Sequence, residues 1–312
     1  MAFSVQNITL GDLNFIRISN LNTLCHIDIS CKGGLLNSWV QGPEKQGFDV
    51  IDGNDFSIGW GAFESNGFKS GKMNPYSCRL NKGCYIHNNK EYKINKYYLG
   101  VHSIHGLVYD ANFVLEHSEV KDNQASVSLV YQYQKQDTGF PFEYEIKLNW
   151  VFEQNNKVSV TTTILNNSAE SFPMMDGWHP YFKLGESIND CAIWFSDQGL
   201  LAYDLELIPT GNIIPHNTFA NGQSLLNITL DNGYVLNPQN VDCILENNNY
   251  KLVVTPISNY GYLQLYTPPH RKSIAIENLS AAPDCFNNKM GLHIMQPQEI
   301  WSLKTQYQLF YK

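Results

Sequence analysis

Arginine is scarce in this chain of 312 residues, occurring only at Arg17, Arg79 and Arg271. The formal net charge is −8 and the isoelectric point is near 5.6. A nucleic-acid-binding protein normally carries a basic stripe or patch, and so few guanidinium groups leave little to clamp a phosphate. We therefore expect neither a nucleic-acid partner nor a polyanionic ligand.

The chain also lacks the segments that mark secreted and membrane proteins. No run approaches the roughly 18 apolar residues that a membrane helix needs, and the first residues lack the basic and apolar regions of a secretory signal. The seven cysteines are odd in number and form no C-x-x-C pair, which argues against a disulfide framework or a zinc site. These absences predict a cytoplasmic protein with reduced thiols and no membrane partner.

Several catalytic motifs are missing as well. The sequence has no G-x-S-x-G elbow, no phosphate-binding P-loop and no G-x-G-x-x-G. His102 and His105 have the spacing of a metal half-site, but no carboxylate or cysteine pair follows at ligand spacing. We expect no metal and no cofactor, which leaves acid–base chemistry by side chains.

What the chain has in abundance is period-two alternation of apolar and polar residues. From Phe142 to Phe152 every second residue is large and apolar, while Glu143, Glu145 and Lys147 face the other way. This pattern is typical of half-buried strands, and turn signals such as Asp-Gly and Asn-Gly separate the runs. Strands are expected at residues 126–134, 142–152, 157–166, 251–256, 262–266 and 273–279. The fold class is therefore all-β, a large antiparallel β-sandwich.

No linker interrupts this pattern, so residues 1–312 are expected to form a single domain. All-β sandwiches often exceed 200 residues as one unit. Residues 41–78 are richer in Gly, Asn and Pro and alternate less. We expect them to form long loops at one end of the sandwich, where sites tend to be built.

The stretch around His179 is the first candidate for chemistry. Pro180 pushes His179 toward extended geometry, just beyond the predicted strand 157–166. Trp178, Tyr181 and Phe182 flank the imidazole, which is the side chain best suited to proton transfer near neutral pH. A histidine among aromatic residues is also a common core residue, so this stretch alone does not decide between the two.

Glu277 is the second candidate, at the end of the predicted strand 273–279. A carboxylate that follows Ile-Ala-Ile is expected to be partly desolvated, which would raise its pKa and suit it to general-base work. A solvated glutamate at a strand end is the alternative. Arg79 offers a planar fork to hydroxyl or carboxylate oxygens, or forms an ordinary ion pair. His105 precedes Gly106, which permits close approach of a ligand.

These residues resemble the signatures of the aldose 1-epimerases, the galactose mutarotases. Residues 179–184, His-Pro-Tyr-Phe-Lys-Leu, resemble the family's His-Pro/Ser-Tyr-Phe-Asn-Leu. Five other segments match in order: 74–85 with Arg79, Gly83 and Tyr85; Ile-His-Gly at 104–106; Thr-Gly-Phe-Pro at 138–141; Pro-Thr-Gly at 209–211; and 276–287 with Glu277, Pro283 and Asp284. The resemblance spans roughly residues 30–310.

The resemblance implies a galactose mutarotase-like supersandwich that interconverts the α and β anomers of a free hexose. It implies that His179 is the catalytic acid and Glu277 the base. Arg79 and His105 match positions that hold sugar hydroxyls. The family's binding aspartate matches Asp231 better than Asp242. Trp178, Tyr181 or Tyr266 is expected to present a ring face to the sugar, with packing in the core as the alternative for each.

The resemblance also has departures, and they keep other functions open. Cys78 stands where an Asn usually precedes the Arg, and Leu107 where a second Gly often follows His105-Gly106. A sugar-phosphate epimerase would need a phosphate clamp, and a non-catalytic sugar-binding sandwich would have no use for an acid–base pair. A domain of a sugar-cleaving enzyme would need two carboxylates. The expected partner is a monosaccharide, bound by a monomer or homodimer.

Overall fold

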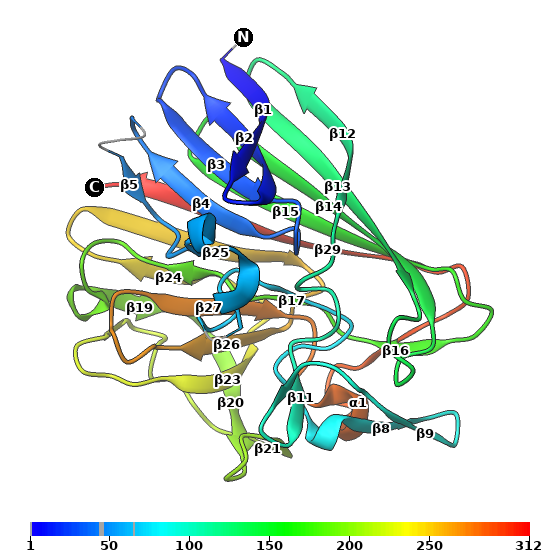
Figure 1. Ribbon diagram of the computed structural model, residues 1–312. Coiled ribbons are helices and arrows are strands. Elements are labelled where there is room, and N and C mark those ends of the chain that lie inside the picture. Colours follow the sequence, from blue (N-terminus) through cyan, green and yellow to red (C-terminus); the bar gives the residue numbers. More distant parts are fainter. Residues whose placement is uncertain (1, 44–46, 65) are drawn as a thin grey trace.

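The computed structural model describes residues 2–43, 47–64 and 66–312. Antiparallel strands dominate it and form three large sheets (Figure 1). The six strands predicted from alternation are all present, within two residues at either end. The fold class, a large antiparallel β-sandwich, is thereby confirmed.

A nine-stranded sheet forms one layer. The C-terminal strand β29 lies inside this sheet, between β15 and β25, and so joins the middle of the chain to its later part. In spatial order the strands are β12 (Val114–Val120), β13 (Gln124–Gln134), β14 (Glu143–Glu153), β15 (Lys157–Asn166), β29 (Ile300–Tyr311), β25 (Tyr250–Ser258), β24 (Cys243–Glu246), β19 (Ala192–Trp194) and β22 (Gln223–Ser224).

Two sheets form the facing layer. The five-stranded sheet holds β1 (Phe3–Leu10), β2 (Leu13–Asn20), β3 (Cys25–Ser30), β4 (Leu36–Gln41) and β5 (Phe48–Asp49). The eight-stranded sheet holds β21 (Pro209–Ile214), β20 (Asp197–Tyr203), β23 (Asp231–Leu236), β26 (Tyr262–Tyr266), β27 (Ile274–Leu279), β17 (Gly177–Trp178), β6 (Lys72–Met73) and, beside β27, β18 (Tyr181–Phe182). A bridge between Ile51 and Phe182 joins the two sheets.

The core lies between these layers, because alternate residues of each strand point inward. Phe3 packs on Phe152 with ring centroids 5.8 Å apart, and Phe182 packs on Tyr307 at 5.3 Å. In β14 the side chains of Tyr144 through Trp150 alternate between buried and half-buried, as the sequence pattern predicts.

The remaining elements are short. Three small sheets consist of β10 (Tyr98–Leu99), β11 (His102–Ile104) and β7 (Arg79–Leu80); β16 (Phe172–Met174) and β28 (His293–Met295); and β8 (Cys84–His87) and β9 (Lys90–Lys93). The helical turns are η1 (Phe56–Ile58), η2 (Trp60–Ala62), η3 (Asn81–Gly83), η4 (Ile188–Asp190) and α1 (Cys285–Asn288). Across the described ranges, no helix has the length and apolarity needed to cross a membrane.

Residues 41–78 are mostly irregular, with the short elements β5, η1, η2 and β6 between loops, as predicted for their described part. All seven cysteines are free thiols, and Cys25, Cys191, Cys243 and Cys285 are buried. This agrees with the reading of the cysteines as reduced, mostly buried residues.

Candidate active site

His179 and Glu277 meet because they lie opposite one another in a common antiparallel register. Gly177 pairs with Leu279, and Tyr181 pairs with Ala275. Counting two residues inward from either pair places His179 opposite Glu277. Side chains directly opposite in such a ladder share a face, with Cβ atoms about 4.5–5.5 Å apart. Accordingly, His179 Nε2 lies 3.4 Å from Glu277 Oε1.

The backbone of His179 is held on both sides. Its N–H donates to the carbonyl of Gly71 at 3.1 Å, and its carbonyl accepts from the N–H of Ser70 at 2.8 Å. The imidazole stacks on the ring of Tyr181, with centroids 5.1 Å apart and planes 9° from parallel. These contacts hold the imidazole in one place beside Glu277.

His105 lies beside this pair. Its ring centroid is 5.0 Å from that of His179. Its backbone N–H donates to the backbone carbonyl of Cys78 at 3.0 Å. Burial, together with the nearby His179 and Arg79, holds the pKa of His105 well below its usual value. The imidazole is therefore neutral, and its Nδ1 has no hydrogen-bond partner within the described part of the chain.

Three polar residues continue the site across the eight-stranded sheet. Gln264 on β26 pairs with Glu277 on β27. Its amide nitrogen donates to Asp231 Oδ1 at 2.9 Å, and its amide oxygen accepts from Tyr203 Oη at 3.0 Å. Sequence reasoning missed Gln264 and Tyr203. A signal for Gln264 was available, because it is the one polar residue within the apolar run 262–266.

These side chains line a cavity of about 290 Å³, close to the lower end of the range for small-molecule sites. Four predicted residues besides the pair reach it: Arg79, His105, Tyr181 and Asp231. The lining also includes Tyr266, one of the rings that the sequence offered to the sugar. The other lining residues were not singled out as ligands: Glu64, Gly67, Phe68, Cys78, Leu99, Ile104, Tyr203, Leu207, Gln264 and Pro283. Four of these come from the loop region 41–78, where a site was expected.

Burial sets the protonation of the central pair. His179 is 6% exposed and Glu277 is 2% exposed. Burial lowers the pKa of His179 to about 4. Burial, reinforced by the charge of Asp231, raises the pKa of Glu277 well above its usual value. The raised carboxyl pKa agrees with the prediction for Glu277.

Trp178 does not reach the cavity, so its predicted contact with a sugar is wrong. Successive residues of a strand point to opposite faces, and Trp178 therefore points away from the face that carries His179. Its ring packs on Trp150 at a centroid distance of 5.2 Å. Asp242 is also outside the cavity lining and accepts from Thr255 Oγ1 at 2.6 Å. Of the two candidate aspartates, only Asp231 reaches the cavity.

His102 and His105 do not face a common point. His102 Nδ1 accepts from the N–H of Lys82 at 3.1 Å, and its Nε2 lies 3.4 Å from Glu206. His105 instead lines the cavity. In the residues that the structure describes, no three His, Cys, Asp or Glu side chains gather in a way that fits a metal ion.

The comparison with protein families decides the assignment. The model of the family described as aldose 1-epimerase matches residues 16–308, nearly the whole chain. The chain belongs to the aldose 1-epimerase family. A search among curated proteins finds no match.

Solved structures of this family share the fold at low sequence identity. A galactose mutarotase-like protein from Clostridium acetobutylicum is 18% identical, with a TM-score of 0.87 over 100% of this chain and 99% of that one. A galactose 1-epimerase from Lactobacillus acidophilus is 16% identical, with a TM-score of 0.83 over 99% and 98%. An aldose epimerase homologue from C. elegans is 15% identical, with a TM-score of 0.79 over 99% of both chains. At such identities the likeness concerns the fold alone.

Proposed function

We propose that this protein is a mutarotase that interconverts the α and β anomers of a free hexose. The observation that carries the proposal is the contact between His179 Nε2 and Glu277 Oε1, 3.4 Å apart and facing a small cavity. Two buried proton-transfer groups of different type, held together, suit a reaction that moves one proton on and one proton off the substrate.

In the proposed reaction, the Glu277 carboxylate takes the proton of the anomeric hydroxyl while the His179 imidazolium protonates the ring oxygen. The C1–O5 bond breaks and C1 becomes an aldehyde. Rotation about C1–C2 presents the other face of the aldehyde, and the two transfers then run in reverse as the ring closes. Each well-placed acid or base typically contributes about 100- to 10,000-fold.

The pair needs one proton between its two members throughout. In the empty site burial favours the neutral form, in which Glu277 holds that proton and His179 does not. Transfer from Glu277 to His179 produces the ionic form that starts ring opening. Sugar hydroxyls that donate to the carboxylate favour the ionic form, because hydrogen bonds to a charged group stabilise it.

The other cavity residues provide complementary contacts for a sugar. Arg79 and neutral His105 can donate to hydroxyl oxygens, while Asp231 and Gln264 can accept from hydroxyl hydrogens. Tyr181 is 2% exposed and stacks on His179, so it supports the imidazole more than it contacts ligand. Tyr266 also lines the cavity and offers a ring face.

The test is polarimetry of freshly dissolved α-glucose, α-galactose and a panel of other aldoses. We expect the wild-type protein to accelerate the change in rotation for at least one sugar. His179→Gln and Glu277→Gln should each lower kcat/KM by at least about 100-fold, because each removes one proton-transfer group. His117→Gln and Glu91→Gln are matched controls at exposed positions and should retain full activity.

The same experiment separates the competing functions. If the wild type leaves every aldose at the buffer rate but binds one in calorimetry, the protein is a sugar-binding sandwich. A sugar-phosphate epimerase is disfavoured by the charges of the cavity lining. Besides the protonated Glu277, its described part carries the acidic side chains of Glu64 and Asp231 against the single guanidinium of Arg79.

A further inference from the structure

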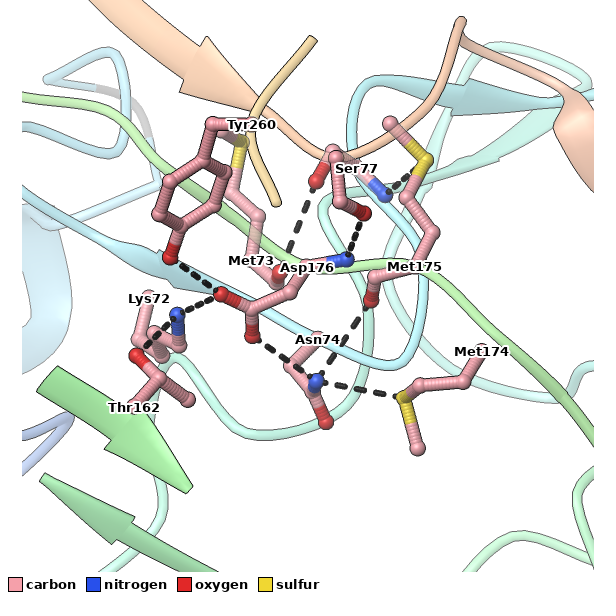
Figure 2. A network of polar contacts seen from close by, with 10 residues as sticks. Lys72, Met73, Asn74, Ser77, Thr162, Met174, Met175, Asp176 and Tyr260 are labelled. Carbon is pink, nitrogen blue, oxygen red and sulfur yellow. Dashed lines mark hydrogen bonds and ion pairs between the residues drawn. The ribbon is translucent and has the colours of Figure 1, made fainter. Parts of the chain in front are cut away.

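A buried ion pair that takes no part in the proposed proton transfers lies in the core next to the site. Lys72 Nζ contacts Asp176 Oδ2, and both side chains are fully buried (Figure 2). Lys72 Nζ also donates to Thr162 Oγ1 at 3.1 Å and lies 4.2 Å from the ring centroid of Trp178. Tyr260 donates its hydroxyl hydrogen to Asp176 Oδ2 at 2.7 Å. The pair therefore links both layers of the sandwich.

Asp176 connects the strands that carry His179 and Glu277. It lies three residues before His179, and Ser280 lies three residues after Glu277. The N–H of Ser280 donates to the carbonyl of Asp176 at 2.9 Å, and the N–H of Asp176 donates to Ser280 Oγ at 2.9 Å. Asp176 thus extends the register that sets His179 opposite Glu277.

Asn74 extends the same network to His105. Its amide nitrogen donates to Asp176 Oδ1 at 3.0 Å (Figure 2). The backbone carbonyl of Asn74 accepts from the N–H of Leu107 at 2.7 Å. Asn74 also forms a β-bridge with Gly106, the residue after His105. The segments that bear His179, Glu277 and His105 therefore meet at Asp176. Its backbone contacts the Glu277 segment at Ser280, and its carboxylate contacts the His105 segment through Asn74.

Stability alone does not account for this pair. Desolvation of two buried charges often exceeds their attraction, so apolar replacements of both partners are frequently neutral or stabilising. Burial lowers the pKa of Lys72 to about 8 even with Asp176 beside it. We infer that the charged groups serve mainly to orient the chain, because each donor and acceptor of the network fixes the orientation of the segment that it contacts.

We propose that Lys72 and Asp176 are positioning residues, which hold His179, Glu277 and His105 in the relative placement that proton transfer to a sugar requires. The inference rests on the proposed function for its kinetic consequence. A displacement of about 1 Å in an active site can cost on the order of 100-fold in rate. Loss of the pair should therefore lower kcat far more than it changes KM.

Two variants test the proposal. Lys72→Met with Asp176→Leu removes both charges at similar volume, and we expect kcat to fall about 10- to 100-fold with KM within about threefold. Tyr260→Phe removes one hydrogen bond to Asp176 and leaves the ion pair, so we expect a folded protein with kcat about 3- to 10-fold lower. Leu252→Ala, a cavity variant in β25 of the other layer, controls for lost stability and should retain kcat.

A second readout does not depend on turnover. NMR titration of the His179 ring, assigned by its absence in His179→Gln, should show a neutral imidazole down to about pH 4 in the wild type. In the double variant the pKa should move toward 6.5 by more than about one unit, because the ring loses its fixed buried place. The Leu252→Ala control should titrate like the wild type.

The two readouts separate the possible failures. An inactive wild type would contradict the proposed mutarotase function, while the NMR comparison would still decide the positioning role. Folded double and Tyr260→Phe variants with wild-type kcat and wild-type His179 titration would overturn the proposal. A double variant that does not fold leaves Tyr260→Phe to decide by the same two measurements.

Discussion

At the scale of single residues, the protonation of His179 and Glu277 controls the proposed chemistry. The one-proton form of the pair is the active one. Below about pH 4 His179 gains a proton while Glu277 keeps its own, so no base remains. Above the raised pKa of Glu277 the pair loses its last proton, so no acid remains. Between these limits the pair holds one proton, and the two limiting pKa values belong to the pair rather than to either residue.

We therefore predict a broad bell-shaped dependence of kcat/KM on pH. The acid limb should lie near pH 4, and the alkaline limb well above the ordinary range of a carboxyl group. The measurement is polarimetric kcat/KM across the pH range, with the buffer rate subtracted, since kcat/KM reports the free enzyme. A single inflection near 6.5, where an exposed histidine titrates, would show that His179 acts alone and unburied.

At this scale the sequence identified the site residues that belong to a motif. It did not predict properties that depend on the packed environment of a residue, such as its charge state. His179, Glu277, Arg79, His105 and Asp231 were all chosen from sequence and all line the cavity. The charge state of His179 was not predictable, because desolvation depends on what packs around it.

Trp178 shows a different kind of error. It is adjacent to His179 in an extended segment, so alternation alone would have placed the two side chains on opposite faces.

At the scale of elements, register determines which residues share the site. Among the six correctly predicted strands the signal is clearest in β14, whose two faces differ sharply in polarity and burial. Which strand pairs with which was not readable, since β17 and β27 are about a hundred residues apart in the chain. Gln264 belongs to the site because it pairs with Glu277. The sequence of one strand does not show which strands pair with it.

Gly106 provides a test at this scale. Its φ is +80°, and a Cβ there would lie 2.2 Å from the carbonyl oxygen of Asn74. We predict that Gly106→Ala lowers the free energy of unfolding by more than about 1 kcal/mol and raises KM, because the backbone that carries His105 must move. Denaturant titration and polarimetry measure the two effects.

The matched control is Gly211→Ala on β21. Gly211 has a similar φ of +88°, but a Cβ there meets nothing within 4 Å. It should show only the strain of the backbone conformation, about 1 kcal/mol, with KM unchanged. If both variants lose the same free energy of unfolding and keep the same KM, the close approach of Gly106 to Asn74 has no importance for the site.

At the scale of the whole molecule, two facing layers bury the site's ionisable groups. The sequence predicted the sandwich from its alternation, but it did not predict that a nine-stranded sheet faces five- and eight-stranded sheets joined by one bridge. Burial of Glu277 by this arrangement has an energetic cost, because the folded state holds a proton that the unfolded chain releases above the ordinary carboxyl pKa.

Glu277→Gln should therefore stabilise the protein increasingly as the pH rises. Between the ordinary pKa of a glutamate and the raised pKa of Glu277, the folded wild type binds more protons than the unfolded chain. Its free energy of unfolding then falls with pH by up to about 1.4 kcal/mol per unit from this group. Below about pH 6.5 the lowered pKa of His179 acts in the opposite direction, since the unfolded chain binds the extra proton there.

The informative comparison is thus between pH 6.5 and 8, where the contribution of His179 falls away and the slope from Glu277 remains. We expect the stability difference between Glu277→Gln and wild type, measured by denaturant unfolding, to widen over this interval. Glu91→Gln, at an exposed position on β9, should follow the wild-type curve. A constant difference from pH 6.5 to 8 would mean that Glu277 is ionised in the folded protein at neutral pH. The proposed reaction would then require the proton of the pair to lie on His179 from the start.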